Sequence, residues 1–247
     1  MLPIRDHNPS TRTPYVTYGL IALNILVFLS YISLFEDDDA LHYFFEDWAM
    51  APGAIAQGSM YHTVLTSMFL HGGLMHLGGN MLFLWIFGDN LEDDLGPLKF
   101  LGFYLASGVG AGLAHVLADP QSFVPTVGAS GAIAGVMGGY LLLYPKARVD
   151  ILFIFIILFK VIPVPAWVML GLWFGLQLFS GTVTDTSGGG VAYWAHAGGF
   201  VIGFLLILPF WLKQGGKDFW ARTAMHPPNP EAKYRTIRTH IPKVTRK

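Results

Sequence analysis

A serine and a histidine, each near the start of an apolar segment, are the residues of this chain best suited to chemistry. Ser130 lies in Val-Gly-Ala-Ser-Gly-Ala-Ile-Ala-Gly, and His196 lies in Ala-His-Ala-Gly-Gly-Phe-Val-Ile-Gly. A third segment, Leu-His-Gly-Gly-Leu-Met-His-Leu-Gly-Gly-Asn, adds His71, His76 and Asn80. A hydroxyl nucleophile, an imidazole base and polar donors are the parts of an acyl-transfer site. Because these segments are apolar, we expect that site to lie inside a membrane.

Each of these residues also has another interpretation. A serine in a membrane helix usually donates to its own backbone carbonyl, whereas a histidine inside a membrane is functional by default. His71 fits a structural role in a loop equally well. A metal site is disfavoured because the chain has no His-Glu-x-x-His run and no carboxylate beside His76. The absence of cysteine excludes disulfides and thiol ligands, so we expect neither a metal nor a cofactor.

The composition is that of an integral membrane protein. The 247 residues are 53% hydrophobic and 13% charged, whereas an average soluble domain has about 25% charged residues. A spanning helix needs roughly 20 residues, and six apolar segments approach this length with help from their flanks. The six segments are 15–35, 74–87, 97–117, 127–144, 166–180 and 191–212.

A seventh apolar segment, 151–162, is ambiguous. It carries Lys160 and runs into Pro163 and Pro165. We interpret it as an interfacial or re-entrant stretch that leads into the fifth helix. A seven-helix arrangement is the alternative, because hydropathy does not separate the two.

The Lys and Arg residues predict the orientation. With both termini in the cytoplasm, all fifteen lie on the inner side of a six-helix topology, and the outer loops carry acidic residues. Cytoplasmic loops are enriched in Lys and Arg, so we expect this orientation. The chain then divides into a cytoplasmic N-terminal segment (1–14), a six-helix domain (15–212) and a basic cytoplasmic tail (213–247). We expect the tail to be disordered, because it is polar and interrupted by prolines.

The predicted topology places the candidate groups at one depth. The helices that contain His76, Ser130 and His196 all run from outside to inside, and each group lies within the first few residues of its helix. At about 1.5 Å per residue, the cluster lies on the order of 5–10 Å below the outer surface.

Small residues repeat at intervals of four on two of these helices. They are Gly131, Gly135 and Gly139 on one helix, and Ala195, Gly199 and Gly203 on the other. Such faces allow close approach of two backbones. We expect this contact to bring Ser130 Oγ within hydrogen-bond reach of the His196 imidazole.

In their order along the chain, these motifs resemble those of the rhomboid intramembrane serine proteases. The matching motifs are His71 with His76-x-x-x-Asn80, Gly128-Ala129-Ser130-Gly131, and Ala195-His196-x-x-Gly199-x-x-x-Gly203. The resemblance implies that Ser130 is the nucleophile and His196 the general base of a dyad without a catalytic acid. It implies an oxyanion hole made of His76, Asn80 and the Ser130 backbone N–H. The supporting residues would be His71, Gly128, Gly131, Gly199 and Gly203.

The resemblance also has two implications for residues outside the active site. It implies that Glu92 ties the inner loop to neighbouring helices. It also implies that the first outer loop, where Leu41, Phe44 and Trp48 follow an amphipathic spacing, is half sunk in the outer leaflet. This loop reads His62-Thr63 where many members carry Trp-Arg, a difference that concerns its packing and not the chemistry.

We therefore expect an all-α membrane protein, a six-transmembrane-helix rhomboid bundle with an interfacial first outer loop, in a bacterial inner membrane. Its active site would open to the outer face, and its partners would be transmembrane protein substrates and the lipid bilayer. The net charge of -1 gives no indication of nucleic-acid binding, and the oligomeric state is not indicated.

Two other functions are the alternatives. One is a non-proteolytic rhomboid-like protein that binds or escorts membrane clients, against which the presence of both Ser130 and His196 argues. The other is a transporter that uses the histidines as a proton relay. A relay would need acidic partners within the helices, and the core segments lack them.

Overall fold

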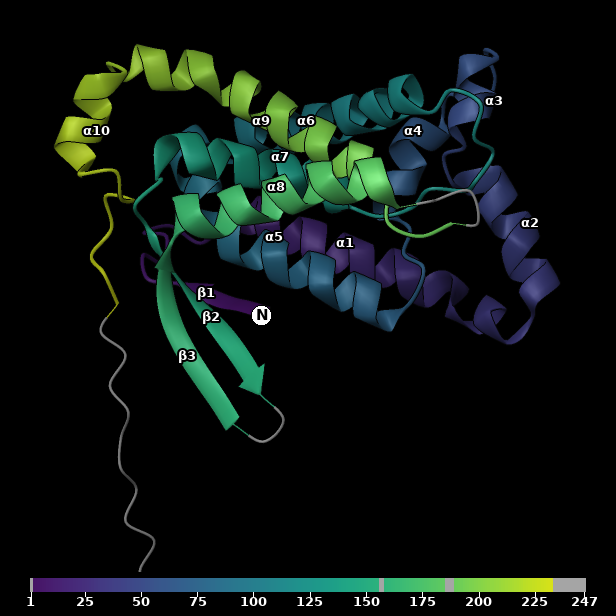
Figure 1. Cartoon of the computed structure of the whole chain (residues 1–247), viewed down its shortest axis with the longest axis horizontal. Helices are drawn as coiled ribbons and strands as arrows, with labels where there is room; N and C mark the ends of the chain where they lie inside the picture. Colours follow the sequence, from purple (N-terminus) through teal and green to yellow (C-terminus); the bar gives the residue numbers. More distant parts are fainter. Residues whose placement is uncertain (1, 156–157, 185–188, 233–247) are drawn as a thin grey trace, which may run out of the picture.

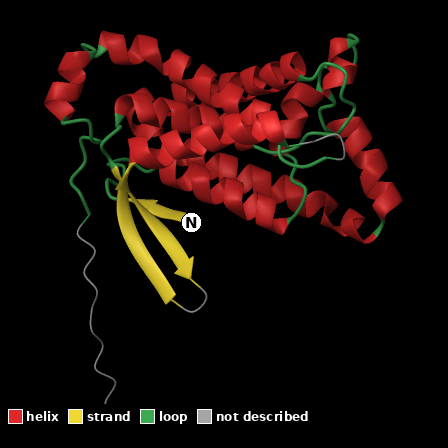
Figure 2. Ribbon diagram, viewed as in Figure 1, coloured by secondary structure: helices red, strands yellow, loops and turns green. Residues whose placement is uncertain are grey.

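The computed structural model describes residues 2–155, 158–184 and 189–232. Its long helices lie side by side in a bundle, and a sheet of three strands among the described residues lies beside one end of it (Figures 1 and 2). The first elements are β1 (Leu2–Asp6), α1 (Tyr15–Tyr31), the 3-10 helix η1 (Ile32–Glu36), α2 (Asp38–Trp48), α3 (Pro52–Ala56), α4 (Thr63–Thr66) and the 3-10 helix η2 (Ser67–Phe69). They are followed by α5 (Leu74–Leu95), α6 (Pro97–Ala118), α7 (Ser130–Leu143), β2 (Arg148–Phe155), β3 (Leu158–Pro165), α8 (Ala166–Val183), α9 (Tyr193–Lys213) and α10 (Lys217–Thr223).

Helix α7 runs through the middle of the bundle. Every residue from Gly131 to Tyr140 is buried, and the helix packs against α5, α6, α8 and α9. A helix that is apolar on all sides is expected either in a protein core or in a membrane, and α7 lies in the core of this bundle. Because α7 is rich in glycine and alanine, its neighbours can approach closely.

Four of the described helices are long and apolar enough to cross a membrane. They are Tyr15–Glu36, Pro97–Ala118, Ala166–Val183 and Tyr193–Lys213. The expected segment 74–87 lies within α5, and the expected segment 127–144 contains the shorter α7. However, α7 has 14 residues, and α5 continues through four acidic residues to Leu95. The count of six spans therefore stays a prediction.

Within the segment 151–162, residues 151–155 and 158–162 lie in strands, so the expected all-α fold class is corrected to a mostly helical fold with a small sheet. Strands β2 and β3 are antiparallel, with Ile151 opposite Ile162, and β1 pairs with the other edge of β2. The run is rich in β-branched and aromatic residues, which favour strands. Pro163 and Pro165 are tolerated because β3 is an edge strand. Hydropathy missed the sheet because a short apolar strand and a short apolar helix have similar hydropathy, and because β1 lies far from β2 in the sequence.

The segment after residue 212 is also more ordered than expected. Helix α10 packs back on the bundle, where Trp220 Nε1 donates to the Leu142 carbonyl at 2.9 Å. The Trp220 ring centroid lies 4.8 Å from that of Trp211. The prediction of a disordered tail is therefore wrong up to residue 232, because these aromatic rings find a packing surface. Its remainder, 233–247, lies outside the described residues.

Glu92 joins α5 to the start of α1, in the kind of tie that the resemblance implied. Its carboxylate accepts the backbone N–H of Val16 at 2.9 Å and both the N–H and the hydroxyl of Thr17 at 2.8 Å. The first N–H groups of a helix have no partner within the helix. Glu92 therefore supplies the missing acceptor from a neighbouring helix.

The loop between α1 and α5 contains three short α-helices and two 3-10 helices. Asp37 begins α2 by accepting the Ala40 N–H at 3.1 Å, as an N-cap does. Phe44 stacks on Tyr31, with ring centroids 4.8 Å apart. His62 Nε2 lies 2.9 Å from the Asp47 carbonyl oxygen. This histidine therefore connects two parts of the loop at the position where the sequence departs from the rhomboid pattern.

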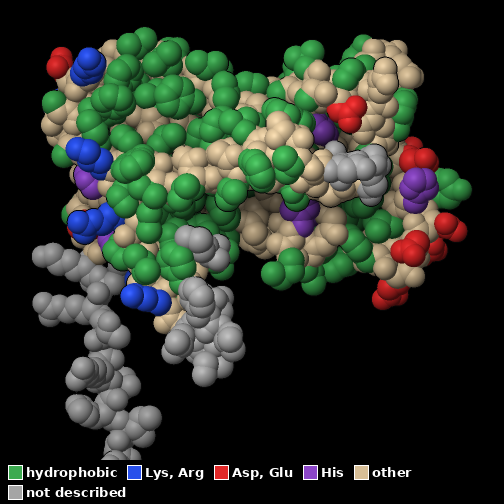
Figure 3. Space-filling model, viewed as in Figure 1, with side chains coloured by type: hydrophobic (Ala, Val, Ile, Leu, Met, Phe, Trp, Pro, Cys, Tyr) green, Lys and Arg blue, Asp and Glu red, His purple; other side chains and the backbone are tan. Residues whose placement is uncertain are grey.

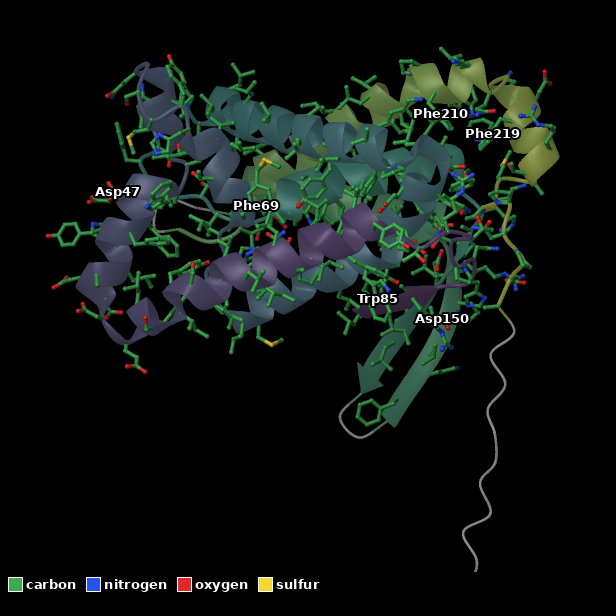
Figure 4. All side chains as sticks on the ribbon, turned by 180° about the vertical axis from the view of Figure 1, so that it is seen from behind. Asp47, Phe69, Trp85, Asp150, Phe210 and Phe219 are labelled. Carbon is green, nitrogen blue, oxygen red and sulfur yellow. The ribbon has the colours of Figure 1, made fainter. Side chains whose placement is uncertain are left out.

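The two ends of the bundle differ in charge. The Lys and Arg side chains visible in Figure 3 gather at the end that carries α10, whereas most of the visible acidic side chains lie toward α2 and α3. Asp47 marks the α2 end in Figure 4, and Asp150 and Phe219 mark the other. The sequence predicted this segregation for its topology. Which end faces the cytoplasm stays a prediction.

Candidate active site

Ser130 and His196 form a hydrogen-bonded pair. Ser130 Oγ lies 2.7 Å from His196 Nε2, although the two residues are 66 positions apart. Ser130 is the first residue of α7, and His196 is the fourth residue of α9. In this geometry the imidazole can take the hydroxyl proton while the oxygen attacks an electrophile.

Glycines set the distance between the two helices that carry this pair. A Cβ built on Gly199 would lie 2.2 Å from the Gly131 carbonyl oxygen, and one on Gly203 would lie 2.1 Å from that of Gly135. Any side chain at these positions would push α7 and α9 apart. The prediction of a close contact through the small faces is confirmed, and its consequence is that a short serine reaches the imidazole.

The other nitrogen of the His196 ring also has a partner, which the sequence did not predict. Gln177 Oε1 on α8 lies 2.9 Å from His196 Nδ1. Trp173, one turn earlier on the same helix, places its ring 5.8 Å from the imidazole at an interplanar angle of 32°. The only sequence signal for Gln177 was that it is an amide inside an apolar segment. Nothing in the neighbouring residues indicated that it would contact His196.

His76 lies next to Gly128, close to Ser130. A Cβ on Gly128 would be 2.9 Å from His76 Nε2 and 3.4 Å from Ser130 Oγ, so glycine leaves room for the ring beside the hydroxyl. Gly128 also has a φ of +130°, which other residues rarely adopt. Its N–H donates to the Ser67 carbonyl at 2.9 Å, which holds the loop before α7 in place.

Asn80 and a backbone N–H complete the polar surroundings of the serine. Asn80 lies one turn after His76, and its Nδ2 donates to the His76 carbonyl at 2.9 Å. Both side chains line the same cavity as Ser130. The Ser130 N–H belongs to the first turn of α7, where N–H groups have no intrahelical acceptor and negative charge is favoured. Such donors can stabilise an oxyanion that forms at the serine.

His71 lies behind this group and does not line the cavity. Its side chain is fully buried. The ring packs edge-to-face on His76, with centroids 5.2 Å apart. Its backbone N–H donates to Tyr31 Oη at 2.7 Å. This position favours a role in supporting His76 over contact with a substrate.

A cavity of about 560 Å³ opens beside the pair. This volume falls in the range of about 300–1,000 Å³ that is usual for ligand sites. Its lining includes the side chains of Ser130, His196, His76, Asn80 and Trp173. Within residues 2–155, 158–184 and 189–232, no three His, Asp or Glu side chains form a group that could hold a metal ion.

Comparison with known proteins relates this chain to one family. The family model described as Rhomboid domain matches residues 58–213. The chain is 33% identical over 205 residues, 82% of its length, to Rhomboid protease GluP of Bacillus subtilis. It is 34% identical over 152 residues, 58% of its length, to Rhomboid protein 1, mitochondrial, of Saccharomyces cerevisiae. It is 29% identical over 138 residues, 55% of its length, to the human Presenilin-associated rhomboid-like protein, mitochondrial.

These relatives are longer than the matched region. The aligned part covers 36% of the Bacillus subtilis protein, 40% of the yeast protein and 35% of the human protein. The chain therefore spans less than half the length of these relatives. The match to the family model includes the segments that contain Ser130 and His196.

Proposed function

The chain belongs to the rhomboid family and is a multi-pass membrane protein, and on that basis we propose that it is an intramembrane serine endopeptidase with Ser130 and His196 as its catalytic dyad. The observation that carries the proposal is the 2.7 Å contact between Ser130 Oγ and His196 Nε2 beside the cavity. The similarity to Rhomboid protease GluP of Bacillus subtilis supports the same activity.

In the acylation step, His196 Nε2 accepts the hydroxyl proton as Ser130 Oγ attacks the carbonyl carbon of the scissile peptide bond. The oxyanion that forms accepts hydrogen bonds from the His76 and Asn80 side chains and from the Ser130 N–H. When the C–N bond breaks, the imidazolium gives its proton to the leaving amine. The acyl group stays on Ser130 as an ester.

Deacylation repeats these roles with water as the nucleophile. His196 takes a proton from the water as its oxygen attacks the ester, and the same donors stabilise the second oxyanion. Breaking the C–O bond returns the proton to Ser130 Oγ and releases the new carboxyl terminus. Water must reach the cavity for this step, and a site near the membrane surface admits it more readily than one at the bilayer centre.

The substrate is a transmembrane protein segment. The cavity lies among helices with lipid-compatible outer faces, and a membrane-spanning substrate can approach it from the bilayer. A regular helix covers its own carbonyls, so cleavage requires local unwinding. We place the cleaved bond near the outer face of the membrane.

The proposed topology has six spans in residues 15–212, with 1–14 and 213–247 in the cytoplasm. The helices α5 and α7 supply the two spans beyond the four that length and composition identify. The Lys and Arg distribution supports this orientation, and the active site then opens to the outer face. We expect this arrangement in a bacterial inner membrane.

The experiment that tests the function compares purified wild-type protein with its Ser130→Ala variant on a panel of single-span reporter proteins. We expect the wild type to cut a subset of reporters and the variant to cut none, while both melt at the same temperature, because removing one oxygen opens almost no cavity. A serine-directed fluorophosphonate should label only the wild type. Undiminished cleavage by the variant would refute the serine mechanism.

The same experiment addresses the alternative, a rhomboid-like protein that binds or escorts membrane clients. In that case the wild type and the Ser130→Ala variant would retain reporters equally well in a pull-down, and neither would cut them. The hydrogen-bonded Ser130–His196 pair favours the protease.

A further inference from the structure

We propose that Gln177 is a positioning residue that orients the His196 imidazole by accepting a hydrogen bond from its Nδ1–H. The inference rests on the proposed protease function and adds a third member to what the sequence predicted as a dyad. The observation behind it is a chain of two contacts, from Ser130 Oγ to His196 Nε2 at 2.7 Å and from His196 Nδ1 to Gln177 Oε1 at 2.9 Å.

The chemistry of a neutral imidazole makes the second contact consequential. One ring nitrogen carries a hydrogen and the other has a free lone pair. For His196 to take the serine proton, the lone pair must be on Nε2 and the hydrogen on Nδ1. A carbonyl oxygen at Nδ1 selects this tautomer, because it can only accept a hydrogen bond.

The contact also restricts rotation of the ring. Gln177 is itself buried, with 9% of its surface exposed, so its side chain is held by its surroundings. Trp173 lies across the ring face at a centroid distance of 5.8 Å. The two residues are four apart on α8, which places them on one face of the helix. Gln177 contacts the edge of the imidazole, and Trp173 packs on its face.

Helix α8 is in turn fixed against α9. Phe174 stacks on Phe200, with ring centroids 4.7 Å apart at an angle of 22°, and Phe200 lies one turn after His196 on α9. The packing of the two helices therefore transmits the orientation of α8 to the catalytic base. A movement of α8 would change the hydrogen bond to Ser130 without any change in the serine itself.

An amide suits this position better than a carboxylate does. Burying an unpaired charge in an apolar bundle costs far more than burying an amide that has a hydrogen-bond partner. Gln177 supplies an acceptor of fixed direction without that cost. When His196 becomes an imidazolium, the same bond is charge-assisted and becomes stronger, so it favours the transition state over the resting enzyme.

The experiment measures steady-state cleavage of a single-span reporter by purified full-length variants. Gln177→Met keeps the side-chain length but removes the acceptor, whereas Gln177→Glu keeps the length and restores an acceptor oxygen. Leu176→Met, at an exposed position one residue away, is the matched control. We expect Gln177→Met to lower kcat about 10- to 100-fold with KM changed less than about threefold, which is the range for losing one charge-assisted hydrogen bond.

Gln177→Glu should recover kcat to within about fivefold of wild type, and Leu176→Met should match the wild type. The rate of Ser130 labelling by a fluorophosphonate should fall in Gln177→Met in parallel with kcat, because labelling reports activation of the serine without a peptide substrate. Melting temperatures of the variants check that the fold is kept.

Two results would overturn the inference. One is a wild-type kcat in a folded Gln177→Met protein. The other is equal impairment of Gln177→Met and Gln177→Glu at unchanged melting temperature, which would indicate that the position requires a shape and not an acceptor. Cleavage that persists in Ser130→Ala would instead refute the protease function itself, so the two failures are distinguishable.

Discussion

Gly203 of α9 lies against Gly135 of α7 so closely that a Cβ at position 203 would come within 2.1 Å of the Gly135 carbonyl oxygen. This contact lies about one and a half turns after Ser130 on α7 and about two turns after His196 on α9. The separation of α7 and α9 at the glycines therefore determines whether the serine and the imidazole remain within hydrogen-bond distance.

Gly203→Ala should destabilise the protein, because the added methyl group forces two backbones apart. Overpacking of this kind costs about 1–3 kcal/mol or more, and we expect both a lower melting temperature and a loss of reporter cleavage. Gly102→Ala in α6 is the matched control, since a Cβ there meets no atom within 4 Å. The importance of the close contact would be disproved by a Gly203→Ala protein as stable and active as the control.

The proposed oxyanion donors should act on turnover and not on substrate binding. His76→Ala and Asn80→Ala each remove one donor, and a lost oxyanion donor typically lowers kcat by about 10² to 10³. KM should change little, because these bonds strengthen only as charge develops on the substrate oxygen. The double variant should lose less than the product of the two single losses. Wild-type rates in both single variants would remove α5 from the mechanism.

Glu92→Ala should weaken the attachment of α1 to the bundle. The substitution leaves the first N–H groups of α1 without their acceptor, and a buried unsatisfied donor costs about 1–3 kcal/mol. We expect a lower melting temperature and easier proteolysis at the start of α1. Glu46→Ala, an exposed glutamate on α2, should have little effect. Equal melting temperatures for the two variants would argue against the cap.

Stability should depend on the ionisation of Asp6 at the α10 end of the molecule. Burial, and next the negative charge of Asp89, raise the pKa of Asp6 from 3.8 to about 7. The folded protein therefore holds a proton on Asp6 that the unfolded chain has already lost. Stability from this group is present below about pH 4 and is lost as the pH rises toward 7.

Asp6→Asn should abolish this dependence, because the amide is neutral at every pH. In the wild type, Asn90 Nδ2 donates to the Asp6 carboxylate at 2.8 Å, and the amide oxygen of the variant can still accept this hydrogen bond. Thermal melts between pH 4 and 8 should show the variant gaining stability relative to wild type as the pH rises, by on the order of a few kcal/mol at most. Asp39→Asn, an exposed residue of α2, serves as the control. Parallel melting curves for Asp6→Asn and wild type would rule the effect out.

Substrate selection should follow the ease of unwinding near the outer face. Glycine and proline lower helix stability by about 1 and 3 kcal/mol relative to alanine, so reporters with these residues in the outer part of the helix should be cut faster. Replacing them with leucine should slow cleavage at that site. Moving them to the cytoplasmic half should abolish it. Equal rates for glycine-containing and all-leucine reporters would show that unwinding is not limiting.

The sequence by itself determined the features that depend on local pattern. Apolar length located the helices, and the interval of four between small residues predicted the contact of α7 with α9, as the glycines at 199 and 203 bear out. The order of the motifs around His76, Ser130 and His196 identified the family. Each of these signals can be read from residues that are close together in the sequence, because helix periodicity and hydropathy are local properties.

The tertiary structure alone decided the contacts between distant segments. Gln177 meets His196 only because α8 packs on α9. Strand β1, at the start of the chain, pairs with β2, which begins at Arg148. A single polar residue in an apolar helix forms no periodic pattern that would predict its partner. The sequence of a strand likewise does not indicate which strand it will pair with. These contacts depend on which faces the helices bury against one another, and the faces come together only when the whole chain has folded.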